Sequence, residues 1–115
     1  MAKQFVLYSL KDGLKEEDFL KFVNEYKGPF VTGLSAVKRY TITSVKAAMH
    51  AKGGPPAPVD TPYKLAAVID LTSLADMKKD AASEAYQKEF MPRFSQWVTE
   101  FLILQAEEIY DNSSE

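Results

Sequence analysis

Residues 3–29 read KQFVLYSLKDGLKEEDFLKFVNEYKGP, and they predict a β-strand that turns directly into an α-helix. β-Forming residues dominate Lys3–Lys11, with apolar side chains on both alternating faces. Asp12-Gly13 is a turn signal. Across Lys15–Tyr26 apolar residues recur at helical spacing, and the first turn is acidic, as the helix dipole favours. Lys27-Gly28-Pro29 then predicts the end of the helix.

Further along the chain, the same kinds of pattern predict three more strands and one more helical region. The strands are expected at Val37–Val45, Tyr63–Leu71 and Thr99–Tyr110. Ser73 and Asp76 fit a capping box, so a helix is expected to begin there, with a second helical segment from Ser83. Pro92 either kinks this region or opens a new helix. Aromatic residues recur on one face of the region and are expected to pack against the sheet: Tyr86, Phe90, Phe94 and Trp97.

The resulting order is β-α-β-β-α-β, which is typical of α+β ferredoxin-like folds, with an antiparallel sheet and helices on one face. The length of 115 residues suits a single domain over 1–115. Ala47–Pro62 holds two glycines and four prolines, so we expect a long loop that is neither helix nor central strand. Loops of this length are usually functional or disordered. Residues 111–115 are expected to form a frayed polar tail.

Composition narrows the class of protein. Hydrophobic residues make up 46%, enough for a packed core, and 14 basic residues stand against 16 acidic ones. No basic stripe is present, so we expect neither a nucleic acid nor a membrane surface as partner. The lack of cysteine excludes disulfides, thiolate metal ligands and a cysteine nucleophile. With no signal-peptide pattern and no apolar run of membrane length, a cytoplasmic location is expected.

The strands are expected to place one set of side chains beneath the helices and a second set on an open face. We assign to the helix side Val6, Tyr8, Leu10, Tyr40, Ile42, Leu102, Leu104 and Ala106. We assign to the open face Phe5, Leu7, Ser9, Val37, Arg39, Thr41, Thr43, Phe101, Ile103, Gln105 and Glu107. This second set is too apolar for a surface in water, so we predict a homodimer with two sheets face to face around a polar-lined cavity. The alternative is a monomer with a partly apolar sheet.

Several segments resemble the dimeric α+β barrel superfamily and, within it, the RedY-like/HapK proteins. The segments are Phe5–Gly13, its turn into Glu16–Phe19, Val37–Tyr40, Tyr63–Thr72 and Glu107–Ile109. The resemblance implies a homodimeric barrel and an association with biosynthesis of prodiginine-type pigments. Other branches are quinone-forming monooxygenases, polyketide cyclases, haem-degrading enzymes, EthD-like proteins and stress-response proteins. These motifs describe a fold and carry no catalytic signature, so no catalytic residue is carried over.

Two residues are candidates for acid–base chemistry. His50 is the only histidine and lies beside the Gly/Pro loop, where a neutral imidazole could act as a general base near pH 7. Cyclases and monooxygenases of the superfamily often use a histidine; the alternative is an exposed loop residue. Asp70, near the end of the third strand, could act as a base if desolvated, or could belong to the turn before the helix. A lone histidine without acidic or cysteine neighbours does not indicate a metal or haem site, and we expect no cofactor.

Four further residues are candidates for binding a ligand. Arg39 and Glu107 fall on the expected open face, and buried charges need partners. They either pair with each other, or Arg39 holds a carboxylate or phenolate of a ligand. Gln105 shares that expected face with them. Tyr63 follows the long loop and could point its hydroxyl at a ligand, whereas Tyr8 and Tyr40 are expected in the core.

Three functions stay open at this point. The first is a cofactor-independent enzyme that acts on a small hydrophobic, aromatic or polyketide-like molecule by cyclisation, dehydration or oxidation; the resemblance also leaves an EthD-like protein or a quinone-forming monooxygenase as an alternative. The second is an accessory protein that binds such an intermediate without changing it. The third is a stress-response or structural dimer without a ligand. The partly polar open face favours the first two hypotheses.

Overall fold

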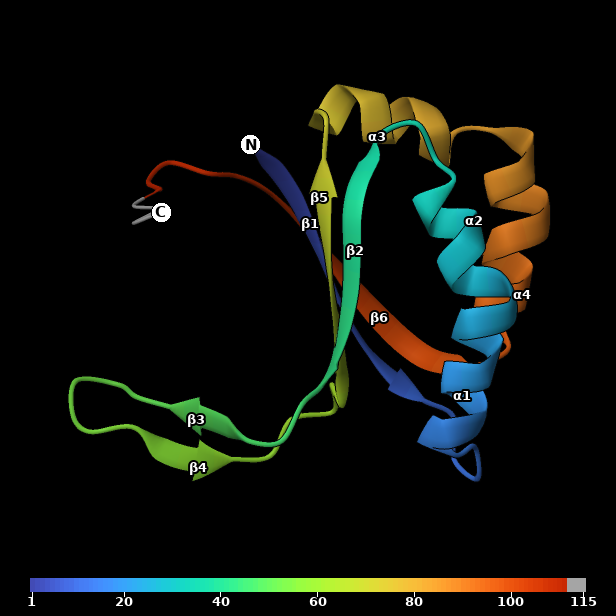
Figure 1. Cartoon of the computed structure of the whole chain (residues 1–115). Helices are drawn as coiled ribbons and strands as arrows, with labels where there is room; N and C mark the ends of the chain where they lie inside the picture. The colour runs from blue at the N-terminus through green and yellow to red at the C-terminus, as the bar shows by residue number, and fades with distance from the viewer. Residues whose placement is uncertain (112–115) are drawn as a thin grey trace.

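A four-stranded antiparallel sheet forms the centre of the computed structural model, which describes residues 1–111 (Figure 1). Its strands follow the order β2-β5-β1-β6. Their bounds are Ala2–Leu10 for β1, Val37–Ser44 for β2, Leu65–Leu71 for β5 and Val98–Glu107 for β6. All helices lie on one face of the sheet (Figure 1). This arrangement confirms the predicted α+β ferredoxin-like fold. The predicted tail at 111–115 lies outside the described residues, apart from Asp111.

The first helical region runs through the predicted stop at Lys27-Gly28-Pro29. Helix α1 (Glu16–Phe22) passes into a π-helical turn, η1 (Val23–Lys27), and then into α2 (Gly28–Thr32). Pro29 would disrupt a regular α-helix, because it has no N–H to donate and its ring crowds the carbonyl four residues before it. The wider π turn accommodates this proline. The Gly28 amide donates to the Val23 carbonyl instead. A Cβ on Gly28 would lie 2.8 Å from that oxygen, so the close approach requires glycine.

The second helical region also contains a π-helical turn just before a proline. Helix α3 (Leu74–Ala81) begins where predicted, since Ser73 Oγ accepts from the Asp76 amide at 3.0 Å. A π-helical turn, η2 (Ala85–Phe90), then leads into α4 (Met91–Ser95), with Pro92 in the first turn of α4. Pro92 therefore follows a π turn as Pro29 does. No helix among residues 1–111 is long and apolar enough to cross a membrane.

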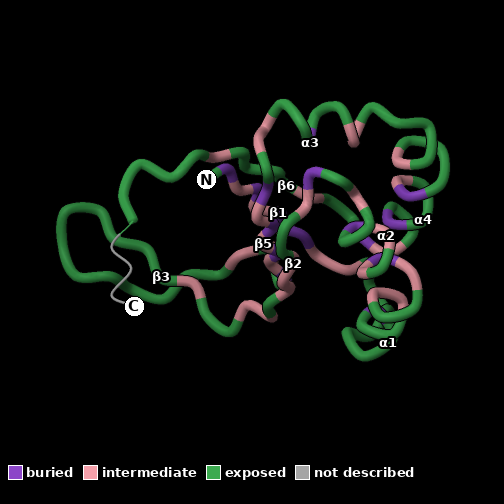
Figure 2. Tube along the Cα trace, turned by 45° about the horizontal axis from the view of Figure 1, so that its top comes forward, coloured by how far each residue is buried: buried purple, intermediate pink, exposed green. Residues whose placement is uncertain are grey.

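The expected loop at 47–62 contains a two-stranded hairpin instead, formed by β3 (Ala48–His50) and β4 (Ala57–Val59). Figure 1 shows this arm leaving the domain on the side of the sheet away from the helices, and its residues are largely exposed (Figure 2). Pro58 is tolerated in β4 because a two-stranded ribbon consists of edge strands only. Gly53 supplies the positive φ of 74° at the tip.

The core lies between the sheet and the helices and is rich in aromatic rings. Tyr8, Phe19, Leu65 and Leu71 are fully buried, and Phe94 is 4% exposed. The Tyr8 ring packs edge-on against the rings of Phe94 and Phe19, with centroids 5.3 and 5.7 Å apart. The predicted packing of Phe90, Phe94 and Trp97 against the sheet is confirmed.

The register corrects the predicted faces of β6. Tyr8 pairs with Phe101 and Val6 with Ile103, so Phe101 and Ile103 lie on the helix side of the sheet. Gln105 follows them there at the period of two, and Leu102, Leu104 and Ala106 face the open side. Because β6 carries apolar residues on both faces, its sequence does not show which face packs against the helices. A shift of one residue in the pairing exchanges the two faces. Val37 also lies on the helix side, because the register shifts between Val37 and Arg39.

Candidate functional site

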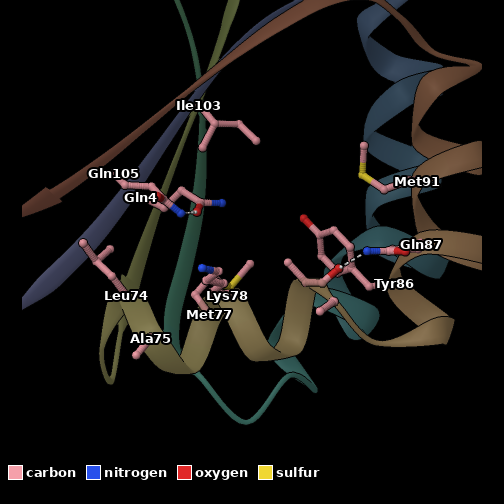
Figure 3. Close-up of a pocket in the computed structure, with 12 residues that line it drawn as sticks. Gln4, Leu74, Ala75, Met77, Lys78, Tyr86, Gln87, Met91, Ile103 and Gln105 are labelled. Carbon is pink, nitrogen blue, oxygen red and sulfur yellow. Dashed lines mark hydrogen bonds between the residues drawn. The ribbon is translucent and has the colours of Figure 1, made fainter.

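A cleft of about 760 Å³ opens between the sheet and the second helical region (Figure 3). We call it the outer cleft. The sheet contributes Gln4, Ile103 and Gln105; the helices contribute Leu74, Ala75, Met77, Lys78, Ala81, Ala82, Tyr86, Gln87 and Met91. This volume lies within the usual range of small-molecule sites, roughly 300–1,000 Å³.

Two amides form the polar part of the sheet side of the outer cleft. Gln4 is only 4% exposed, and its Oε1 accepts from Gln105 Nε2 at 3.3 Å (Figure 3). Lys78 is exposed at the helical wall. The lining thus combines apolar side chains with a neutral amide pair and one cation, and it suits an apolar molecule with a polar or anionic group.

A smaller space of about 30 Å³ lies deeper between the sheet and the helices. We call it the inner chamber. It is lined in common with the outer cleft by Gln4, Met77, Tyr86, Met91 and Ile103. Lys27, Phe90, Phe94 and Phe101 are among the residues that line the chamber alone. Its volume holds about one or two water-sized groups.

Lys27 is the charged residue buried in this chamber, with 4% of its surface exposed. It comes from the end of η1, and its Nζ donates a hydrogen bond to Tyr40 Oη on β2. Three rings surround the amine, with centroids 4.7 Å (Tyr40), 4.9 Å (Phe94) and 5.5 Å (Tyr8) from Nζ. A lysine that is held this way is positioned by both layers of the fold.

Burial dominates the electrostatics of the chamber. It lowers the pKa of Lys27 to about 7. Burial raises the pKa of Tyr8 and of Tyr40, so both phenols stay protonated near neutral pH. Ion pairs within residues 1–111 involve Lys3 and Lys88, and none involves Lys27. The Tyr8 hydroxyl is buried without a hydrogen-bond partner in that part of the chain. Lys27, which lines the chamber, therefore loses its proton far more readily than an exposed lysine does.

The structure places His50 and Tyr63 away from the outer cleft. His50 is exposed on β3, in the arm that leaves the domain on the far side of the sheet (Figure 1). Tyr63 is half-buried in the connection before β5, where its amide donates to Thr61 Oγ1 at 3.2 Å. Neither lines the outer cleft or the inner chamber.

Arg39 and Asp70 are brought together, but on the open face. They are register partners on β2 and β5, beside a shallow hollow of about 210 Å³. Lys3 Nζ lies 2.6 Å from Asp70 Oδ1, so this carboxylate has a cationic partner. Among residues 1–111, Asp70 therefore belongs to an ion pair on the sheet surface.

Gln105 and Glu107 lie on the helix side of β6, so their expected place on the open face is wrong. Gln105 still reaches a site, since it lines the outer cleft. A pair between Arg39 and Glu107, one of the two alternatives for these charges, does not form within residues 1–111, because β2 and β6 are opposite edges of the sheet.

Sequence reasoning missed Lys27, Gln4 and Tyr86 as site residues. A signal for Lys27 was present, since it follows Phe19 by eight residues and Val23 by four. Those spacings place it on the apolar face of a continuous helix. The predicted helix end at Lys27 concealed this, because it placed the lysine at a helix terminus and not within a continuing helix.

The fold and the outer cleft together define a small α+β protein of the ferredoxin-like class with a ligand-sized cleft between sheet and helices. The family model described as REDY-like protein HapK matches residues 2–109. The chain therefore belongs to the HapK family, which confirms the resemblance read from the sequence. No curated protein matches the chain.

Solved structures share the fold at low sequence identity. HapK from Hahella chejuensis is 19% identical with a TM-score of 0.70, and the match covers 100% of this chain and 99% of that one. A ferredoxin-like protein of Thermobifida fusca, described as dimeric and of unknown function, is 13% identical with a TM-score of 0.62 over 91% and 88% of the two chains. A hydroxynitrile lyase from Passiflora edulis is 15% identical with a TM-score of 0.66 over 96% of each chain. At these identities the likeness concerns the fold.

Proposed function

We propose that this protein is a homodimer that binds a small hydrophobic or aromatic molecule in the outer cleft of each protomer. The observation that carries the proposal is the cleft itself, which shares five lining residues with the inner chamber that Lys27 lines. We further propose that it acts on this molecule, or shelters it, as a cofactor-independent component of secondary metabolism. The HapK family membership supports that setting.

The open face of the sheet supports the homodimer. Leu102 and Leu104 are 42% and 46% exposed there, with Phe5 and Leu7 half-buried beside them. A continuous apolar surface of this kind favours association over contact with water. The β3–β4 arm leaves the domain on the same side, so a second sheet packed there lies within its reach (Figure 1). The dimeric description of the Thermobifida fusca protein agrees with this arrangement.

A dye titration with a cleft-filling variant tests the binding proposal. Anilinonaphthalene sulfonate combines an aromatic body with an anionic group, which matches the apolar lining and the exposed Lys78. Ala81 lines the outer cleft and is half-buried, so Ala81→Phe should fill the cleft and weaken dye binding by roughly tenfold or more. Ala85 is exposed on η2 and does not line the cleft, so Ala85→Phe is the matched control. Equal dye affinity in both variants would show that the cleft is not the binding site.

A non-catalytic binding protein is the second candidate. It is favoured by the lining of the outer cleft, which includes amides, a phenol and an ammonium group but no carboxylate or imidazole among the described residues. Turnover of the bound molecule by the purified protein distinguishes the two candidates once a physiological ligand is in hand.

A further inference from the structure

We propose that the Lys27 amine forms a Schiff base with an aldehyde or ketone whose body occupies the outer cleft. This inference rests on the proposed function, because the cleft must first take up the molecule. It adds the chemical class of the ligand, a carbonyl compound, and a covalent step that binding alone does not require.

The geometry fits a molecule with a carbonyl at its tip. The outer cleft has the volume for the body of a small molecule, whereas the inner chamber has room for a group of about one or two heavy atoms. Met77 and Met91 line both spaces, and unbranched methionine side chains rearrange readily. A carbonyl that passes them enters the chamber that Lys27 and Phe94 line, and Lys27 Nζ lies 4.9 Å from the centroid of that Phe94 ring.

The surroundings of Lys27 favour a nucleophilic amine. An ammonium group buried without a carboxylate is costly, and Lys27 has a phenol and aromatic rings as neighbours but no ion pair within residues 1–111. The pKa of about 7 that burial gives this group agrees with that argument. Lysines that form Schiff bases are activated by desolvation of this kind.

Formation of the Schiff base needs only the amine and the carbonyl compound, and it releases one water molecule. The nitrogen lone pair of Lys27 attacks the carbonyl carbon, and the carbonyl oxygen becomes a hydroxyl by taking a proton from the nitrogen. The carbon–oxygen bond of this carbinolamine then breaks, and the hydroxyl leaves as water with the second proton. The product is a carbon–nitrogen double bond, with no oxidant or reductant consumed. Tyr40 Oη, which is hydrogen-bonded to Nζ, is placed to pass each proton from nitrogen to oxygen.

A structural role is the competing explanation for Lys27. The three rings and the Tyr40 hydroxyl could hold its ammonium form as a packing element between helix and sheet. A lysine of that kind does not react with a carbonyl compound at neutral pH. Reactivity of the folded protein therefore decides between the two explanations.

Reductive trapping measures this reactivity directly. The wild-type protein is incubated at pH 7 with benzaldehyde and sodium cyanoborohydride, and the adduct is located by peptide mass mapping. An ordinary lysine of pKa about 10.4 is neutral at pH 7 for less than about one molecule in a thousand. We therefore expect Lys27 to be labelled at least roughly tenfold faster than Lys78, the exposed lysine of the same cleft.

The variants make the result specific. Lys27→Met should abolish the fast adduct, and Ala81→Phe should slow it by blocking the route through the cleft. Lys79→Met, at an exposed lysine of α3 that does not line the cleft, should retain it. Label spread over surface lysines with Lys27 unmodified would overturn the proposal, and so would unchanged labelling of Lys27 in Ala81→Phe. The wild-type map does not depend on any variant folding. Dye binding that is lost in Ala81→Phe, with no adduct on Lys27, would end the Schiff-base proposal and leave the binding proposal intact.

Discussion

Lys27 and Tyr40 meet across the interface between the helices and the sheet, the amine on the π turn η1 and the phenol on the edge strand β2. The hydrogen bond between them ties a local irregularity of the helix to a strand. π Turns inside helices are frequent at functional sites. Here the turn lets the chain pass Pro29 and ends with a lysine that is buried in the inner chamber.

The stability of the protein should depend on pH through Lys27. Its pKa is about 7 in the folded chain and about 10.4 in an unfolded one, so the unfolded chain binds one more proton between these values. The free energy of unfolding therefore gains from this residue as pH rises, by up to about 1.4 kcal/mol per pH unit. The phenols of Tyr8 and Tyr40 beside the amine stay neutral, as does that of Tyr86 on the chamber lining, because burial raises the pKa of each.

Lys27→Met removes this dependence, and urea unfolding at several pH values measures it. The variant should be more stable than wild type at pH 7, and its advantage should shrink by roughly 2–3 kcal/mol by pH 9. The lost partner of Tyr40 is a constant cost and does not change that slope. Lys78→Met is the control, since an exposed side chain should leave the wild-type profile unchanged. A difference between Lys27→Met and wild type that does not vary with pH would contradict the prediction.

Tyr40→Phe should destabilise the protein by about 1–3 kcal/mol, because it removes the hydrogen-bond partner of the buried amine of Lys27. Tyr63→Phe is a matched control, since the hydroxyl of Tyr63 makes no hydrogen bond within residues 1–111 and the residue is half-buried. It should change the free energy of unfolding by less than about 0.5 kcal/mol. Chemical denaturation of both variants at one pH makes the comparison, and equal losses would show that the Tyr40 hydroxyl has no special role.

Gly28→Ala should cost about 1–3 kcal/mol, because the added Cβ would lie 2.8 Å from the Val23 carbonyl oxygen inside η1. Gly54→Ala in the β3–β4 arm is the control: a Cβ there meets nothing within 4 Å and its backbone has no positive φ. It should be neutral within about 0.5 kcal/mol. Thermal unfolding of the two variants tests the contrast, and a stable Gly28→Ala protein would mean that the π turn relaxes without loss.

The order of strands and helices could be predicted because it depends on local patterns that are clear in the sequence. The Ser73 cap and the aromatic spacing around Phe94 are examples, and both are confirmed. The faces of β6 could not be predicted, since Ile103 and Leu104 are equally apolar and only pairing with β1 separates them. Lys27 was missed for a different reason: a π turn carries the helix past Pro29, and no local propensity predicts one.

The strand register places Leu104 on the open face of the sheet. For the proposed sheet-to-sheet dimer, Leu104→Arg should give monomers in sedimentation velocity, because it places a charge in the apolar contact. Leu20 is the matched control: its side chain is 41% exposed on α1, close to the 46% of Leu104, but on the helical layer. Leu20→Arg should leave the dimer intact. If Leu104→Arg remained dimeric while Leu20→Arg dissociated, the protomers would associate through their helices, and the sheet faces would not form the barrel.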